Sequence, residues 1–524
     1  MLDRLRDRRE PWDLVIIGGG ATGMGVAVDA ASRGFDVLLL EQSDFGKGTS
    51  TRSTKLVHGG VRYLKQGNVS LVMEALRERG TLLQNAPHLV SDLQFIVPNY
   101  VWWEAPFYGV GMKVYDVLAG RYRFGKSRNL SVEETIARLP NIERDGLRGG
   151  VLYHDGQFDD ARLLVNLAQT AVEQGAVLVN YARVGAVLKN GAGFVDGVRI
   201  HEIEGDAELE ARARVVVNAT GPFTDAVRRM DDPAVRPMIA PSQGVHVTLA
   251  REFLAGDSAI MVPRTSDGRV LFAVPWHGHV IVGTTDTPLD TVSLEPRATD
   301  EEIDFILETA VQYLVKDPTR DDVLSVFAGI RPLVKKMGEE ENTAELSRDH
   351  TIEVSHSGLI TIAGGKWTTY RNMAEDCVDH AITIGDLEER PCVTKTLRIH
   401  GHTRDADRFG ALSWYGADAT AVQSLIDSRD DYAQRLHADL PYRAGEVVWA
   451  AKHEMARTVD DYLSRRSRTT FLNARAGIAM APTVAQLLAE ALGRNEAWID
   501  AQVKTYRELA SGYLVGGAER ALAS

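Results

Sequence analysis

The sequence predicts an α/β fold that is followed by an all-helical C-terminal region. Near the N-terminus, apolar runs over 14–17 and 37–40 flank a glycine-rich turn and an alanine-rich segment. This is the order of strand, turn, helix and strand that forms a βαβ unit. Residues 236–330 carry several short apolar runs separated by turns, and from about residue 395 helical spacing takes over.

The turn after the first apolar run has the spacing of a dinucleotide-binding site. Gly18, Gly20 and Gly23 form G-x-G-x-x-G. The first glycine allows the tight turn, the second lets the backbone approach a pyrophosphate, and the third allows close packing of helix and strand. Ala21 and Thr22 lie in the same helix start, where free N–H groups favour phosphate.

An acidic residue, Glu41, ends the second apolar run. Its carboxylate is expected to accept hydrogen bonds from a ribose and to disfavour a 2′-phosphate, which argues against NADP. The motif by itself does not separate NAD from FAD. A later apolar strand over 214–220 ends in Ala-Thr-Gly, which looks like the second signature of flavoproteins and favours FAD.

Composition and charge narrow the class of protein. The 524 residues suffice for two or three domains, and 44% hydrophobic and 25% charged residues are ordinary for a globular protein. The net charge of −13 argues against general nucleic-acid binding. Cys377 and Cys392 provide no disulfide framework, which fits a reducing compartment.

The acidic residues among the N-terminal arginines argue against a signal peptide, and no run of about 20 apolar residues appears, so we expect a cytoplasmic protein without a membrane-spanning helix. The H-x-H pairs His277/His279 and His400/His402 lack acidic or cysteine partners at metal spacing, so we expect no metal site.

Two stretches leave alternatives open. Residues 44–67 are rich in Gly, Ser and Thr with interspersed cations, so they either run along the cofactor or form a solvated basic loop. Residues 101–124 combine Trp102, Trp103 and Phe107 with several cations. Aromatic residues beside cations suit a membrane surface or a quinone-binding patch, and ordinary core packing explains them as well.

Apolar spacing predicts the main elements, and Arg390-Pro391 predicts a domain boundary near 390. The expected helices are 69–86, 161–174, 301–315, 372–384, 444–463 and 482–493. The expected strands include 176–179, 184–188, 246–249, 259–262, 270–273, 280–283 and 359–363.

Six motifs in order resemble those of the FAD-dependent glycerol-3-phosphate dehydrogenases. They are GGGATG at 18–23, STKLVHGGVRYL at 53–64, NATGPFTD at 218–225, VGTTDTP at 282–288, AGIRPLV at 328–334 and AGGKWTTYR at 363–371. The helical tail matches too, through residues 453–469, and the resemblance spans about 12 to 515.

The resemblance implies a D-amino-acid oxidase-like fold, in which a Rossmann-type FAD-binding part and a β-rich substrate part are interleaved over 1–390. The substrate part would lie mainly at 236–330 and the all-α domain at 391–524. It also implies non-covalent FAD and oxidation of sn-glycerol 3-phosphate to dihydroxyacetone phosphate, with electrons passed to membrane quinone in glycerol catabolism. Peripheral contact with the cytoplasmic face of the inner membrane would follow.

The resemblance also implies which residues bind the cofactor. These are Gly18, Gly20, Ala21, Thr22, Gly23, Glu41, Thr49, Ser53, Lys55, His58, Gly59, Gly60, Val184, Ala219, Gly221, Gly365, Lys366 and Thr368.

Substrate recognition requires fixed cations, because the substrate ends in a doubly negative phosphate. By resemblance, Arg331 and Lys366 are the first candidates for the phosphate contact. A lone arginine is usually a surface charge, but neither of these two sequence contexts resembles a solvated helix face. The remaining residues expected to line the pocket are Arg62, Tyr63, His246, Arg348 and Thr368.

Oxidation of a secondary alcohol requires removal of the hydroxyl proton, and histidine is the natural base near neutral pH. His246 is the candidate base and acts with Arg331 in the expected catalytic pair, while His58 is the rival. A purely structural histidine is the alternative. The turn at Thr284, Thr285 and Asp286 either orients strands or touches the ligand, and the sequence does not decide between these roles.

Three other functions compete with the quinone-linked dehydrogenase. The first is an oxidase in which oxygen reoxidises the flavin, and the second is an amino-acid or glycine oxidase on the same fold. The third is a flavin-binding interaction module without turnover. The tail helices could pack internally or form a homodimer interface, and the sequence does not distinguish the two.

Overall fold

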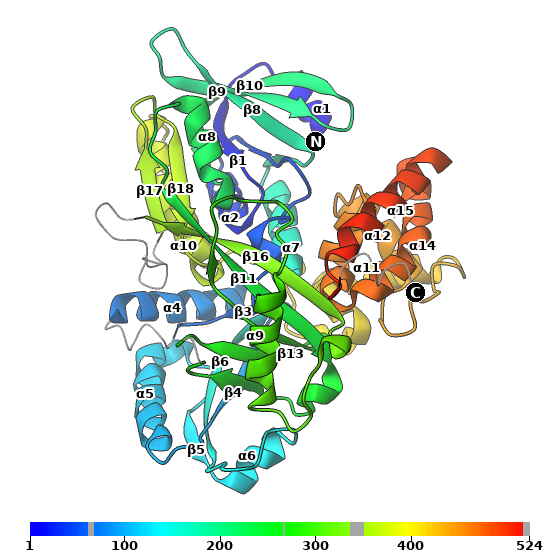
Figure 1. Cartoon of the computed structure of the whole chain (residues 1–524). Helices are drawn as coiled ribbons and strands as arrows, with labels where there is room; N and C mark the ends of the chain where they lie inside the picture. The colour runs from blue at the N-terminus through cyan, green and yellow to red at the C-terminus, as the bar shows by residue number, and fades with distance from the viewer. Residues whose placement is uncertain (61–67, 266–267, 336–349, 517–524) are drawn as a thin grey trace.

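The computed structural model describes residues 1–60, 68–265, 268–335 and 350–516 and contains two β-sheets and a C-terminal group of helices (Figure 1). The first sheet runs in the order β17 (His350–Val354), β18 (Ile360–Gly364), β10 (Ala207–Asn218), β1 (Trp12–Ile17), β2 (Val37–Leu40) and β7 (Val177–Val179). All neighbours from β18 to β7 pair in parallel, and β17 is antiparallel.

The central strand β1 is buried on both sides, as its continuous apolar run predicts. Leu14 and Ile16 pack into the core that contains the helices α2 (Ala21–Ser32), α7 (Asp160–Glu173) and α10 (Tyr370–Ile384). Val15 and Ile17 pack with an antiparallel layer of β8 (Ala182–Lys189), β9 (Val195–Glu202) and the first half of β10.

Parallel strands bring their carboxyl ends to one edge of the sheet. Here that edge collects four segments that lie far apart in the sequence. The glycine turn follows β1, Glu41 follows β2, the Ala-Thr-Gly turn follows β10, and the Gly-Gly-Lys loop follows β18. The fold therefore brings the predicted cofactor motifs together.

The second sheet has ten strands. They are β3 (Leu56–Val57), β4 (Val90–Pro98), β5 (Arg128–Leu130), β6 (Gly150–Phe158), β11 (Ile239–Ala250), β12 (Ala259–Val262), β13 (Leu271–Trp276), β14 (His279–Gly283), β15 (Thr287–Pro288) and β16 (Ser325–Val334). The strand-rich part at 236–330 supplies only some of these strands. β4 joins the sheet by pairing with β12 on one side and β6 on the other.

Outside the two sheets, helices pack around the edges and form the C-terminal group. Those before residue 370 are α1 (Leu2–Asp7), α4 (Val69–Asn85), α5 (Glu104–Ala119), α6 (Val132–Arg138), α8 (Thr224–Asp231) and α9 (Asp300–Val311). The C-terminal group comprises η7 (Ala406–Asp418), α11 (Ala419–Asp427), α12 (Ala444–His453), the π-helical turn η8 (Asp461–Arg466), α13 (Thr469–Leu472), α14 (Ala474–Leu492) and α15 (Glu496–Ser511). In Figure 1 the α11–α15 group and α5 lie at opposite sides of the molecule.

The predicted helix over 444–463 is wrong, because α12 ends at His453. Met455 has a left-handed backbone, with φ of 55°. The break directs the buried Glu454 towards Arg162, whose two terminal nitrogens donate to its carboxylate at 2.9 and 2.8 Å. This partner lies 292 residues away, so local helical spacing carries no signal of it.

No helix within the described ranges is long and apolar enough to cross a bilayer.

Candidate functional site

The glycine turn after β1 has the geometry of a phosphate cradle. Gly18 has φ of +108°, and a Cβ placed there would lie 2.7 Å from the carbonyl oxygen of Ala219. A Cβ on Gly23 would lie 2.0 Å from the oxygen of Gly18, so both positions require glycine. The side chain of the N-cap, Gly20, cannot cap helix α2, and the N–H of Ala21 donates to Ser50 Oγ at 2.9 Å. The N–H groups of Thr22 and Gly23 in the first turn are left for an anion.

Glu41 lies beside this cradle. Its carboxylate accepts hydrogen bonds from the N–H groups of Gly19, at 2.7 Å, and Ser43, at 2.9 Å. Burial raises the pKa of Glu41, and the two N–H groups oppose that effect. The two bonds hold the carboxylate at the edge of the sheet, where the ribose of a dinucleotide fits. Together with the N–H groups of Thr22 and Gly23 at the helix start, this geometry suits the ADP half of FAD.

A cavity of about 1160 Å³ lies between the two sheets and α5. Of the residues predicted to bind cofactor or substrate, nine border it: Thr49, Ser53, His58, Gly60, His246, Arg331, Gly365, Lys366 and Thr368. The predicted residues Gly18 to Gly23, Glu41, Ala219 and Gly221 lie at the strand ends and adjoining turns described above. Arg62, Tyr63 and Arg348 fall outside the described residues.

Three predicted cofactor residues lie away from the cavity wall. Lys55 is fully buried, and its ammonium donates to both carboxylate oxygens of Asp160 at 2.8 Å and to the carbonyl oxygen of Thr51 at 2.8 Å. The role that the structure gives Lys55 is to hold the 51–55 loop. Val184 is buried in β8 within the antiparallel layer, and Gly59 lies behind the wall, where its N–H donates to the Tyr115 hydroxyl at 2.8 Å.

The turn at 284–286, whose role the sequence did not decide, orients the side chain of Arg331. The guanidinium donates to the carbonyl oxygen of Thr285 at 3.1 Å, to Asp286 Oδ1 at 3.0 Å and to Thr284 Oγ1 at 3.1 Å. Space for it exists because Gly244 has no side chain; a Cβ there would lie 2.5 Å from Arg331 Nη2. The turn therefore orients Arg331, and all three of its residues also border the cavity.

His246 is almost fully buried at the base of the cavity, with its ring stacked on Phe327 at a centroid distance of 5.0 Å. Its Nε2 lies 2.9 Å from Thr54 Oγ1, and its Nδ1 has no hydrogen-bond partner within the described ranges. Burial holds the pKa of His246 well below its ordinary value, and the positive charges of Arg331 and Lys55 add to the effect. The imidazole is therefore neutral near pH 7 and able to accept a proton.

Thr54 is a functional residue that sequence reasoning missed. It lies within the basic loop, whose residues gave no hint of a contact with a strand 192 positions later. Gly283 is a second such residue. A Cβ there would lie 2.4 Å from His246 Cδ2, so this glycine in VGTTD makes room for the imidazole.

The HGG and Gly-Gly-Lys loops are joined through Thr368. Its hydroxyl accepts a hydrogen bond from the N–H of His58 at 3.2 Å. Trp367 Nε1 donates to the carbonyl oxygen of Ser50 at 2.7 Å. These contacts fix His58 and Lys366 on the same side of the cavity. In the described parts of the chain, no group of three or more His, Cys, Asp or Glu is arranged for a metal ion.

The opposite wall of the cavity is apolar and belongs to α5. Tyr108 and Tyr115 are buried, so core packing explains these two aromatic residues. The same helix and its N-cap carry solvent-exposed apolar side chains at helical spacing: Trp103, Phe107, Val110, Val114 and Val117. All of these except Val117 also border the cavity, so the apolar wall continues onto the exposed surface. Trp102, just before the helix, is 76% exposed.

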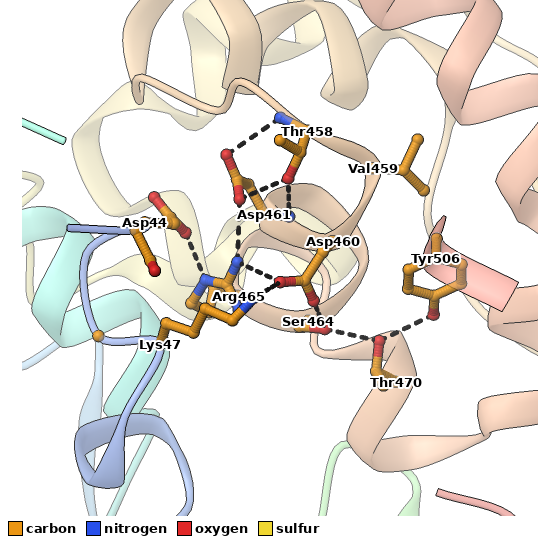
Figure 2. Close-up of polar contacts among 12 residues, drawn as sticks. Asp44, Lys47, Thr458, Val459, Asp460, Asp461, Ser464, Arg465, Thr470 and Tyr506 are labelled. Atoms are coloured by element: carbon orange, nitrogen blue, oxygen red, sulfur yellow. Dashed lines mark hydrogen bonds and ion pairs between the residues drawn. The ribbon is translucent and has the colours of Figure 1, made fainter. Parts of the chain in front are cut away.

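A buried ionic network ties the cofactor edge to the C-terminal domain (Figure 2). Asp44, three residues after Glu41, has no solvent exposure and accepts hydrogen bonds from Arg465 and Arg466 of η8. Arg465 also donates to Asp460 and Asp461, both at 3.0 Å. Burial alone would raise the pKa of Asp44, but the two guanidinium groups outweigh it and hold that pKa below its ordinary value.

The network bears on the cradle because the loop after Asp44 contacts it directly. The N–H of Gly46 donates to the carbonyl oxygen of Gly19 at 3.0 Å. Lys47 in the same loop donates to Asp460 at 3.1 Å. The C-terminal domain thereby fixes the loop that adjoins the dinucleotide site.

We predict that Arg465→Gln loosens the expected FAD. The substitution leaves the buried Asp461 without a charged partner among the described residues and leaves Asp44 with Arg466 alone. Loss of one partner of a buried ion pair costs about 3–5 kcal/mol in folded proteins. The dissociation constant of the cofactor should rise at least about tenfold, and the measurement is titration of the apoprotein by flavin fluorescence.

Arg465→Lys should recover part of the affinity because it keeps the charge. Arg429→Gln is the matched control, since Arg429 pairs with Asp431 and Glu490 on the surface of the same domain. Equal affinity of Arg465→Gln and the control would contradict the role of the network.

Comparison with known proteins agrees with this geometry. A family model described as FAD dependent oxidoreductase matches residues 13–371. A second model, described as the C-terminal domain of alpha-glycerophosphate oxidase, matches residues 359–499.

Individual relatives are similar over most of their length. The chain is 41% identical to a probable mitochondrial glycerol-3-phosphate dehydrogenase of Caenorhabditis elegans, over 95% of this chain and 73% of that protein. It is 40% identical to the mitochondrial glycerol-3-phosphate dehydrogenase of Homo sapiens, over 96% of this chain and 73% of that protein.

Solved structures show the same likeness. The glycerol-3-phosphate dehydrogenase of Bacillus halodurans complexed with FAD has a TM-score of 0.80 and 29% identity, with 98% of each chain covered. The L-alpha-glycerophosphate oxidase of Mycoplasma pneumoniae shares the fold at a TM-score of 0.57 and 18% identity, over 74% of this chain and 98% of that one.

One assignment follows from three findings: the glycine cradle with Glu41 at one edge of the sheet, the matching family models, and the relatives at about 40% identity. The chain belongs to the family of FAD-dependent glycerol-3-phosphate dehydrogenases, and FAD is its cofactor.

Proposed function

We propose that this protein oxidises sn-glycerol 3-phosphate to dihydroxyacetone phosphate and passes the electrons to membrane quinone, as a step of glycerol catabolism. The observation that carries the proposal is the single cavity that brings Arg331, Lys366 and the neutral His246 together beside the cofactor edge. Two cations suit a phosphate, and a neutral imidazole suits a secondary alcohol. An amino-acid oxidase would instead need partners for a carboxylate and an amine.

Arg331 and Lys366 are proposed to bind the phosphate. Arg331 is held in one orientation by Asp286 and the Thr285 carbonyl, so little side-chain entropy is lost when a ligand binds. Lys366 lies at the N-cap of the 3₁₀ turn η6 (Trp367–Thr369), and α10 begins directly after this turn, at Tyr370.

His246 is proposed to remove the proton from the substrate hydroxyl. The hydrogen bond with Thr54 occupies Nε2, which leaves Nδ1 as the nitrogen without a partner within the described ranges. FAD, when bound, supplies the hydride acceptor. The role of the chain is to orient the alcohol, hold the phosphate and take the proton.

We predict that His246→Ala slows flavin reduction by glycerol 3-phosphate by about 100-fold or more, as expected when a general base is lost. The measurement is anaerobic stopped-flow bleaching of the flavin. In the unmodified protein the rate should hold as pH falls from about 8 to 6. A pKa held well below the ordinary value of about 6.5 keeps the imidazole neutral across that range.

His201→Ala serves as the control, because His201 lies on the surface of β9, paired with Glu208. A normal bleaching rate in His246→Ala would remove it as the base. No bleaching of the unmodified protein by glycerol 3-phosphate would overturn the proposed function and favour a flavin-binding module without turnover.

We predict that Arg331→Ala raises the KM for glycerol 3-phosphate by about 10- to 100-fold. This corresponds to the loss of a charge-assisted bond of about 1.5–3 kcal/mol. Steady-state kinetics with an artificial electron acceptor measures the effect. Arg320→Ala is the matched control, since Arg320 pairs with Asp300 and Asp304 outside the cavity. An unchanged KM in Arg331→Ala would place the phosphate elsewhere.

Membrane quinone is the proposed acceptor because the apolar wall of the cavity and the exposed face of α5 belong to the same helix. Exposed cations follow that helix at Arg121, Arg123 and Lys126. An apolar helix face beside cations suits the surface of an anionic membrane. The protein would then act at the cytoplasmic face of the inner membrane. An oxidase that uses oxygen would not require this surface.

We predict that Trp102→Ala together with Trp103→Ala weakens co-sedimentation with anionic liposomes by at least about tenfold, because two large apolar contacts are lost. Phe194→Ala is the control, since Phe194 is 54% exposed on a β-turn far from α5 in sequence. Equal sedimentation of the two variants would argue against α5 as the membrane contact. High hydrogen peroxide yield without reduction of a quinone analogue would favour the oxidase.

A further inference from the structure

A second, smaller cavity lies away from the large one, where the chain passes into the C-terminal domain. Its volume is about 470 Å³, within the range of small-molecule sites. One side is the C-terminal end of α4, at Gln84 and Asn85, and the other is the segment 395–404.

The lining of this cavity carries only one sign of charge. Lys395, Arg398 and Arg404 are cationic, and no carboxylate is among the lining residues, which also include His402. This is unusual in a chain whose net charge is −13. Like charges gathered in one concave site repel one another, and an anion relieves that repulsion.

The two arginines are available for a ligand. Arg398 and Arg404 are exposed, and neither makes an ion pair or side-chain hydrogen bond with another residue in the described ranges. Lys395 pairs with Glu375 at 3.1 Å, and His402 Nε2 donates to the carbonyl oxygen of Gln84 at 3.2 Å. Two unpaired guanidinium forks match the geometry of a phosphate group.

Hydrogen bonds hold the two sides of the cavity, the end of α4 and the segment 395–404, against each other. The Asn85 side chain donates to the carbonyl oxygen of Thr394, and the N–H of Ile399 donates to the Asn85 carbonyl oxygen, both at 3.0 Å. The guanidinium of Arg371 donates to Thr394 Oγ1 at 3.3 Å and to both oxygens of Glu78 in α4, at 2.7 and 2.8 Å.

The geometry points to a second anion site, in which Arg398, Arg404 and Lys395 bind a small, soluble phosphate-bearing molecule. It is separate from the site proposed for glycerol 3-phosphate, since the two cavities share no lining residue. Arg371, which braces Thr394, lies two residues after Thr369 at the end of the Gly-Gly-Lys loop. Thr394, next to the lining residue Lys395, is therefore connected through Arg371 to the start of α10, five residues after Lys366.

The test uses the FAD-loaded protein with inorganic pyrophosphate as the probe at constant ionic strength. Arg331→Ala serves as the background, so that binding in the large cavity is weakened. Calorimetry should show one pyrophosphate bound per chain. At about a hundredfold excess over the dissociation constant, the Tm should rise by about 2 °C.

Adding Arg398→Gln and Arg404→Gln should abolish both the heat of binding and the shift in Tm. Arg408→Gln, a change of a neighbouring exposed arginine outside the cavity, should leave both unchanged. Unaltered flavin absorbance and circular dichroism would establish that the double variant is folded. Pyrophosphate binding that persists in the double variant, or that is absent from the Arg331→Ala background, would overturn the second site without bearing on the proposed oxidation.

Discussion

The buried carboxylate of Asp44 sets a condition that the rest of the structure has to meet. A charge without solvent contact is stable only when it is paired and hydrogen-bonded, and the two guanidinium groups that reach Asp44 come from η8, more than 400 residues later. The C-terminal helices therefore do more than cover the nucleotide fold. They complete the charge balance of the loop that touches the glycine cradle.

The same arrangement recurs at the base of the large cavity. The ammonium of Lys55 is enclosed by Asp160 and by the rings of Trp276, Phe327 and Phe471, at 4.8, 5.4 and 5.2 Å from the ring centroids. Phe471 belongs to the C-terminal domain, and Phe327 stacks on His246. A buried ion pair thus holds the loop that carries Thr54 against His246, while aromatic packing holds the ring from the other side.

The sequence predicts a feature of this structure when the residues that form it lie close together in the chain. The glycine turn and Glu41 are separated by a short βαβ unit, so their chemistry is legible from spacing. Thr54 and His246 are 192 residues apart, and the contact arises only when β11 and the loop are folded. The wrong helix end at 453 has the same origin, because Arg162 draws Glu454 out of helical register. The ten-stranded sheet exceeds the predicted range since β4 pairs with β12 of the distant segment and also with β6, which thereby joins the same sheet.

The large cavity is polar at one end and apolar at the other, and this asymmetry has a consequence for the proposed reaction. A doubly charged phosphate loses hydration on entering an apolar passage and is stabilised only where Arg331 and Lys366 replace that hydration. An apolar acceptor has the opposite preference and is stabilised along the wall formed by α5. If both molecules meet the flavin in this cavity, they need not compete for the same approach. The proposed quinone would gain more from the wall formed by α5 than dioxygen would, because the hydrophobic gain scales with the apolar area buried and dioxygen is small.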